Sequence, residues 1–187
     1  RLWAAGALVS NVGTWMGRVG QDWLVLTVLT AGSATALGIV TGLQFLPFLL
    51  LAPWAGLIAD RFPKRRILLA TQTLLALSSL LLGILAVTGA AQLWQVYAIA
   101  LFQGVVTAID NPARQAFVSE MVPDDKLANA VSLNSASFNL GRLIGPGLAG
   151  VVIALWGVGP ALMLNTVTFV FVLVALLRLR TNELRPA

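Results

Sequence analysis

Three polar residues of the first apolar stretch could together bind and release a proton. Asn11, Arg18 and Asp22 lie close to one stripe of a helix, and Thr14 borders that stripe. A carboxylate can exchange a proton near neutral pH when its burial and its charged neighbours change between two states of a protein. The pattern predicts Asp22 as a proton-coupling carboxylate and Arg18 as its movable counter-charge. The alternative is a static ion pair that holds this stretch to its neighbours.

Other polar side chains in apolar stretches are candidates for lining a cavity. A charged group in such a stretch normally faces a protein interior or a water-filled space. Arg142 is charged and needs a partner that the sequence does not identify. We expect Trp15 to be the tryptophan that contacts an apolar substrate. Further candidates for the cavity wall are Gln103, Asn134 and Asn139.

The composition excludes most chemistry of soluble enzymes. Of 187 residues, 58% are apolar and 10% are charged, against about 25% charged in a typical soluble domain. The chain has no Cys and no His, which excludes thiol nucleophiles, histidine bases and the usual zinc sites. We expect no metal, no cofactor and no nucleic-acid partner, since the excess of 12 Lys and Arg over 7 Asp and Glu occurs in a nearly uncharged chain.

Six apolar stretches are long enough to cross a bilayer and to position these side chains. A hydrocarbon core of about 30 Å needs roughly 20 apolar residues in a helix. The stretches run over about 2–29, 36–59, 67–88, 93–109, 127–155 and 160–177. The predicted fold class is all-α, a polytopic membrane protein with six transmembrane helices in one domain over residues 1–187.

The connections between the stretches alternate in charge. Segments 30–35, 89–92 and 156–159 carry no charge, whereas ten of the twelve basic residues lie in the other connections and near the ends of the sequence. The excess of Lys and Arg on cytoplasmic loops predicts that this side, with both termini of the segment, is cytoplasmic.

The run GLIADRFPKRRILL, residues 56–69, resembles the signature loop of the major facilitator superfamily, with Pro63 in place of a usual Gly. We expect Gly56 to allow close approach of two helices. Asp60 can cap a neighbouring helix or pair with an Arg, and the basic run can bind anionic lipid. The alternative is a plain cytoplasmic loop. The residues in register are Gly56, Asp60, Arg61, Lys64 and Arg65.

The run GRLIGPGLAG, residues 141–150, resembles the fifth-span signature of drug–proton antiporters of that superfamily. Small residues at every fourth position allow tight helix contact, and Pro146 removes a hydrogen bond and bends the helix. The resemblance implies that this face meets a helix of a second half of the transporter and seals the closed state. The alternative is a generic packing stripe. The motif residues are Gly141, Gly145, Pro146, Ala149 and Gly150.

The run DNPARQAF, residues 110–117, resembles a branch of the superfamily that includes enterobactin exporters and macrolide efflux proteins. We expect Pro112–Met121 to form a short helix at the cytoplasmic interface. Asp110 and Arg114 are four residues apart and can pair with each other. They can also contact the loop that carries Asp60. The alternative is a solvated loop.

The resemblance implies the N-terminal six-helix half of a twelve-helix fold, built from two inverted three-helix repeats, with the second half apparently absent. It implies a bacterial inner-membrane transporter that exports amphipathic small molecules of drug or siderophore type by alternating access, driven by protons. The implied partners are the substrate, protons, the bilayer and the C-terminal half. Many such antiporters have an Arg where this chain has Ala100, which argues against a proton relay in the fourth span.

Four other classes of membrane protein fit less well or stay open. An intramembrane protease would need a His base or a paired-Asp arrangement with G-x-G-D, and an ATP-driven exporter would need a phosphate-binding loop. The sequence has neither feature, so we expect no enzyme. An uptake symporter of the same superfamily and a non-transport membrane scaffold stay open as alternatives.

Overall fold

The computed structural model describes residues 2–178, which fold into long helices without a strand in that range. Two short irregular turns accompany them, a π-helical turn at Leu24–Leu29 that extends α1 and a 3-10 turn at Asp124–Lys126 that precedes α5. The all-α fold class is therefore confirmed. The long helices are α1 (Leu2–Trp23), α2 (Ala34–Arg61), α3 (Lys64–Val87), α4 (Leu93–Glu120), α5 (Leu127–Trp156) and α6 (Val158–Arg178).

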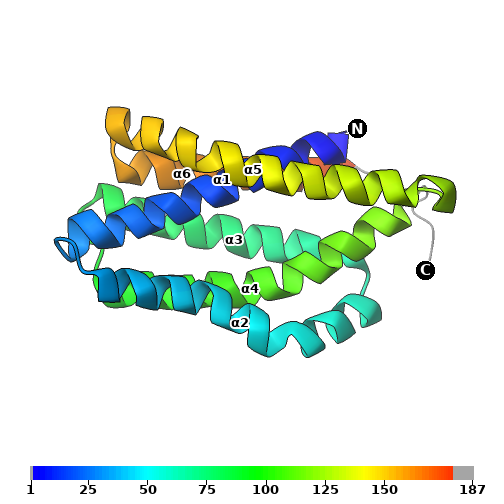
Figure 1. The fold of residues 1–187 in the computed structure, drawn as a ribbon, viewed down its shortest axis with the longest axis horizontal. Helices are drawn as coiled ribbons and strands as arrows, with labels where there is room; N and C mark the ends of the chain where they lie inside the picture. Colours follow the sequence, from blue (N-terminus) through cyan, green and yellow to red (C-terminus); the bar gives the residue numbers. More distant parts are fainter. Residues whose placement is uncertain (1, 179–187) are drawn as a thin grey trace.

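The helices run side by side along the long axis of the molecule (Figure 1). The turns after α1, α3 and α5, which carry no charge, lie together at one end of the bundle. The turns after α2 and α4 lie at the opposite end, with the N-terminus (Figure 1). The alternation of charge along the sequence thus becomes a separation of charge between the two ends of the molecule.

The helices pack in pairs that are not neighbours in sequence. The most extensive contacts are those of α2 with α4, of α3 with α6, and of α1 with both α5 and α6. Apolar clusters form toward each end of the bundle, one around Phe117 and Leu68 and the other around Leu82 and Val96. The polar side chains of the site lie between these two packed ends.

Five helices of the described chain, α2 to α6, are long and apolar enough to cross a membrane. Helix α1 is outside this set because Asn11, Arg18, Gln21 and Asp22 lower its mean hydropathy. Its buried residues pack against α5 and α6 rather than facing outward. That α1 also crosses the membrane stays a prediction.

The predicted short helix at Pro112–Met121 is wrong. Helix α4 continues without a break from Leu93 through Pro112 to Glu120. Proline removes one backbone hydrogen bond from a helix, but the side chains after it in the sequence are held by packing. Ala113 and Phe117 are fully buried in the apolar cluster with Leu68. Packing against α3 and α6 therefore keeps this segment part of α4, although Pro112 had predicted the start of a separate helix.

Candidate functional site

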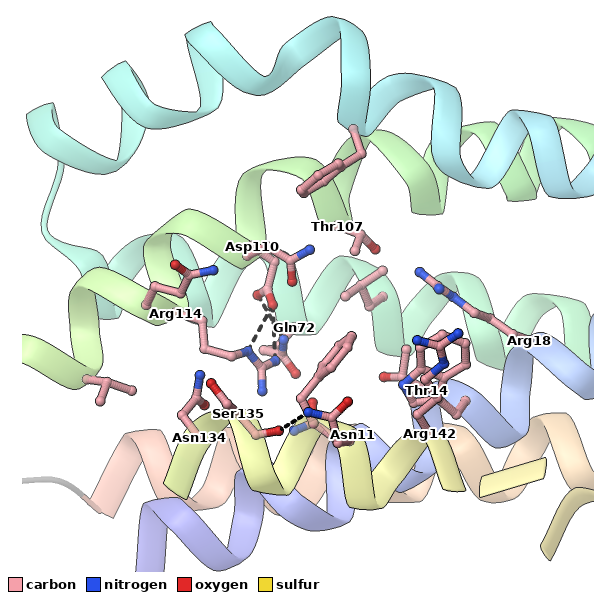
Figure 2. Close-up of a pocket in the computed structure, with 18 of the residues that line it drawn as sticks. Asn11, Thr14, Arg18, Gln72, Thr107, Asp110, Arg114, Asn134, Ser135 and Arg142 are labelled. Carbon is pink, nitrogen blue, oxygen red and sulfur yellow. Dashed lines mark hydrogen bonds and ion pairs between the residues drawn. The ribbon is translucent and has the colours of Figure 1, made fainter. Parts of the chain in front are cut away.

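A cavity of about 610 Å³ lies between the helices, and all six contribute to its wall (Figure 2). Its wall combines aromatic rings with amide, hydroxyl and guanidinium groups. Such a mixture suits a ligand with both apolar and polar parts. The residues that line the cavity include Asn11, Thr14, Trp15, Arg18, Gln44, Phe45, Gln72, Asp110, Arg114, Asn134, Phe138, Asn139 and Arg142.

Helix α1 supplies one face of the cavity through Asn11 and Arg18 of the predicted polar stripe and through Thr14, which borders it. Asn11 is buried, and its Nδ2 donates a hydrogen bond to Ser137 Oγ on α5 at 3.2 Å. The third member of the stripe, Asp22, is not among the lining residues. The structure thus brings most of the stripe to one cavity, but not its carboxylate.

The environment of Asp22 bears on the alternative interpretation, the static ion pair with Arg18. The ion pairs within residues 2–178 do not include Asp22 with Arg18, so the static pair is not present there. Asp22 Oδ1 is buried and has no hydrogen-bond partner among the same residues. Asp22 is therefore a partly buried carboxylate that interacts electrostatically with Arg18 without forming an ion pair with it.

Trp15 is the centre of a cluster of cations and rings. The guanidinium carbon of Arg18 lies 4.9 Å from the centroid of the Trp15 ring and 4.8 Å from that of Phe45. The guanidinium carbon of Arg142 lies 5.5 Å from the same Trp15 centroid. Figure 2 shows Arg18 and Arg142 together at one end of the cavity. The partner that Arg142 needed is thus an aromatic face, which attracts a cation electrostatically.

At the other end of the cavity, the predicted pair of Asp110 and Arg114 forms and is part of a larger network (Figure 2). Arg114 donates from Nε and Nη2 to Asp110 Oδ2, at 3.3 and 3.0 Å. On α3, Thr71 Oγ1 and Gln72 Nε2 donate to Asp110 Oδ1, at 2.6 and 2.8 Å. Ser10 Oγ of α1 donates to Gln72 Oε1 at 3.4 Å. One buried carboxylate therefore connects α1, α3 and α4.

The sequence interpretation missed Thr71, Gln72 and Ser10. It also placed Asp110 in a loop, whereas the side chain is buried, with 3% of the residue exposed, inside α4. One signal was present, because Thr71 and Gln72 are neighbouring polar residues within a long apolar stretch. Polar side chains buried in such a stretch require partners, and a carboxylate is the strongest acceptor available.

Gln103 does not line the main cavity. It lines a small adjoining pocket of about 40 Å³ that shares Thr14, Arg18 and other lining residues with the main cavity, and its Nε2 donates to Ser78 Oγ at 3.1 Å. Asn134 and Asn139 do line the main cavity, as expected. Gln44, which was not a candidate from the sequence, also lines it and donates from Nε2 to Gln21 Oε1 at 3.3 Å.

Residues of the signature loop connect the ends of helices through hydrogen bonds and an ion pair. Arg65 donates from Nε to the carbonyl of Leu176 at 2.9 Å and from Nη2 to that of Leu177 at 3.2 Å, at the C-terminus of α6. Lys64 pairs with Glu120 at 3.1 Å, which joins the start of α3 to the end of α4. Both contacts place a cation against a helix C-terminus or an acid, where it is stabilising.

Other members of this loop lie elsewhere than expected. Asp60 and Arg61 are exposed and form no ion pair within the described range, so the expected contact of Asp110 with the Asp60 loop is not found. No helix within the described chain approaches Gly56 closely, since a Cβ there would meet nothing within 4 Å, and the close approach expected at this residue stays a prediction. The close contact of α2 with α4 occurs at Gly104, whose added Cβ would lie 2.7 Å from the Leu43 carbonyl oxygen.

The small residues of α5 pack tightly against α1. A Cβ on Gly141 would lie 2.8 Å from the backbone of Asn11, and a Cβ on Gly145 would lie 2.7 Å from Trp15 Cβ. Ala149 is fully buried on the same face. Within the described chain this face packs against α1, and its expected contact with a second half stays a prediction. Pro146 lies within α5, and Gly150 is exposed on another face.

A family model described as a transmembrane secretion effector matches residues 1–186. The chain belongs to the major facilitator superfamily. Its fold is accordingly part of a membrane transporter fold and not that of an enzyme. The five apolar helices agree with a multi-pass bacterial membrane protein of this superfamily.

Curated relatives in the superfamily include transporters and efflux proteins. The staphyloferrin A transporter of Staphylococcus aureus is 37% identical over 78% of this chain and 36% of its own length. The multidrug efflux pump Tap of Mycolicibacterium fortuitum is 32% identical over 81% of this chain and 38% of its own length. Macrolide efflux protein A of Streptococcus pyogenes is 24% identical over 67% of this chain and 31% of its own length. The matched region thus spans about a third of the length of these relatives.

Proposed function

We propose that this chain forms the N-terminal six-helix half of a twelve-helix secondary transporter that exports amphipathic small molecules. The observation that carries the proposal is the cavity of about 610 Å³, to which all six helices contribute. A central cavity shared by every helix is suited to a carrier, because tilting the helices against one another changes the access to it. Relatives named for a siderophore, for macrolides and for multiple drugs support the class of substrate.

The second half, the membrane and protons are the further partners in this proposal. Large apolar side chains are exposed along the outer faces of the helices, among them Leu49 of α2 and Leu143 of α5. Such faces require lipid or another apolar helix to cover them. The uncharged turns at one end of the bundle and the basic turns at the other support an inner-membrane orientation with both ends of this segment cytoplasmic.

For coupling, we propose that Asp22 binds the transported proton and that Arg18 is its movable counter-charge. The support is geometric. Asp22 Oδ1 is buried without a hydrogen-bond partner among the described residues, and Arg18, one helical turn away, contacts aromatic rings and forms no ion pair with this carboxylate. A change in helix packing that brings Arg18 to Asp22 would favour release of the proton. The contacts of Lys64 with Glu120 and of Arg114 with Asp110 are then candidates for the gate that alternates with this change.

The test measures substrate and proton fluxes with the protein that carries this chain in proteoliposomes of known orientation. Anionic, neutral and cationic amphipathic dyes are the substrates, and a pH-sensitive dye reports the protons. We expect export of a dye with a counterflow of protons. Asp22→Asn should abolish proton-driven flux but leave dye binding intact, while Asp125→Asn, an exposed change in the loop before α5, should alter neither.

Three results would contradict the proposal in different ways. Wild-type proton-driven flux in Asp22→Asn would exclude Asp22 as the coupling group. Accumulation of dye together with protons would identify an uptake symporter. Absence of gradient-driven flux for all three classes of dye would favour a non-transport role.

A further inference from the structure

Two guanidinium groups in the cavity wall form no ion pair with a carboxylate among the described side chains, although Arg18 interacts electrostatically with Asp22 beyond ion-pair distance. Arg18 of α1 and Arg142 of α5 both line the cavity, and both face the Trp15 ring. The ion pairs within residues 2–178 are those of Lys64 with Glu120 and of Arg114 with Asp110. The two cations are therefore held against an aromatic ring and not against an acid.

The rest of the lining does not supply the missing negative charge. Its charged members in the described chain are Arg18, Arg114, Arg142 and Asp110. The carboxylate of Asp110 is fully engaged by Arg114, Thr71 and Gln72. Asp22, the other acid near Arg18, lies outside the lining and forms no ion pair with it in that part of the chain. The cavity wall thus has an excess of positive charge, located around Trp15.

This arrangement is suited to an anion for three reasons. Charged groups within membrane helices are costly and are associated with substrate pathways. A cavity with one sign of charge between low-dielectric walls concentrates ligands of the opposite sign. Cation–π contact uses the flat face of a guanidinium and leaves its edge donors available, and that edge matches the two oxygens of a carboxylate.

We infer that the cavity binds an amphipathic organic anion with carboxylate groups. The acidic groups contact Arg18 and Arg142, and the apolar part lies against Trp15 and Phe138. The centroids of these two rings are 5.8 Å apart, and the rings are arranged edge to face. Both guanidinium carbons lie within 5.5 Å of one ring centroid, so a single small ligand can reach both. That such an anion is also transported rests on the function proposed above; its binding does not.

The test compares three probes that share one ring system and differ in charge. Naphthalene dicarboxylate, naphthalene dicarboxamide and bis(aminomethyl)naphthalene are an anion, a neutral compound and a cation. Equilibrium binding is measured with the detergent-solubilised protein that carries this chain, and flux is measured with the same protein in proteoliposomes. We expect the dicarboxylate to bind at least tenfold more tightly than either of the others.

Variants that remove a charge then test whether Arg18 and Arg142 cause the preference for the dicarboxylate. Arg18→Gln and Arg142→Gln should each weaken dicarboxylate binding about tenfold and leave dicarboxamide binding unchanged. The matched control is Lys126→Gln, which removes an exposed cation outside the cavity and should change neither. Arg18→Lys and Arg142→Lys keep the positive charge and should keep part of the preference for the dicarboxylate. If the Gln variants are unstable, the Lys variants distinguish the loss of charge from the loss of folded protein.

Equal binding of the three probes, a preference for the diamine, or an unchanged preference in both Gln variants would overturn the inference. Two further results separate it from the proposed function. A preference for the dicarboxylate without flux of any probe would contradict transport alone. Flux of the diamine without binding of the dicarboxylate would leave transport in place and remove the anion site.

Discussion

Asp110 is the residue on which the polar interior of the bundle depends. Its carboxylate accepts hydrogen bonds from Thr71, Gln72 and Arg114, and almost none of it is exposed. Removing one partner of a buried ion pair leaves the other charged and unpaired, which costs about 3–5 kcal/mol. Gln72 extends the network to Ser10 of α1, so a change at Asp110 reaches three helices.

We expect Asp110→Asn to lower the free energy of unfolding by about 1–3 kcal/mol, because Arg114, which is partly buried in the cavity wall, loses its partner. Unfolding by increasing concentrations of a denaturing detergent, followed by circular dichroism, measures the change. The double variant Asp110→Asn with Arg114→Gln should recover part of the loss, since the unpaired charge is then gone. Equal stability of wild type and Asp110→Asn would show that the network contributes little.

Local contacts of this site could be predicted, and the long-range ones could not. Asp110 and Arg114 are one helical turn apart, so the sequence spacing was sufficient to pair them. Thr71 and Gln72 lie almost forty residues earlier, and their contact with Asp110 depends on how α3 packs against α4. The contacts of Arg18 and Arg142 with Trp15 also depend on long-range packing, because they require α1 and α5 to meet at Gly145.

At the scale of helices, the contact of α5 with α1 depends on the absence of side chains. A Cβ on Gly145 would lie 2.7 Å from Trp15 Cβ and 2.8 Å from the Val12 carbonyl oxygen, closer than real atoms approach. The helices must therefore separate if a methyl group is added. Because Trp15 belongs to this contact and to the cavity, the packing of the two helices also determines the shape of the wall.

We expect Gly145→Ala to destabilise the protein by about 1–3 kcal/mol, the usual cost of overpacking. The matched control is Gly147→Ala on the same helix, where an added Cβ meets nothing within 4 Å. That change should be neutral or stabilising by about 0.5–1 kcal/mol, because Ala favours a helix over Gly. Comparison of the two unfolding curves checks the prediction, and similar losses in both variants would contradict it.

The neighbouring residues Arg65 and Arg66 provide a second test at this scale. Arg65 donates two hydrogen bonds to carbonyls at the C-terminus of α6, whereas Arg66 is exposed. We expect Arg65→Gln to cost about 1 kcal/mol, through lost hydrogen bonds and a weaker interaction with the helix dipole. Arg66→Gln should have a much smaller effect on the same unfolding transition. The reverse order would exclude Arg65 as the residue that holds α6.

For the whole molecule, the separation of charge between the two ends predicts an orientation that can be measured directly. The chain has no Cys, so single cysteines can be introduced without background from residues 1–187. A membrane-impermeant maleimide added to intact cells should label a cysteine at Ala90, between α3 and α4, and should not label one at Asp125, before α5. Permeabilised cells should show labelling of both, and the opposite pattern in intact cells would reverse the orientation.

The fold of the whole chain could be predicted more fully than its site. Long apolar stretches separated by short turns leave few alternatives to membrane helices, and the boundaries of α2, α3, α5 and α6 lie within a few residues of those expected. Helix α4 was expected to end at residue 109 and reaches Glu120, because buried contacts of Ala113 and Phe117 outweigh the effect of Pro112. Side-chain partners across the bundle depend on such packing.

Trp15 has one further consequence, for spectroscopy. The guanidinium carbons of Arg18 and Arg142 both lie within 5.5 Å of the centroid of its ring. An electric field of this kind shifts the energy of an indole excited state, so the emission wavelength of Trp15 depends on the positions of Arg18 and Arg142. A molecule that draws either guanidinium away from the ring would change the colour of the emitted light. The cavity thus contains its own optical reporter of occupancy.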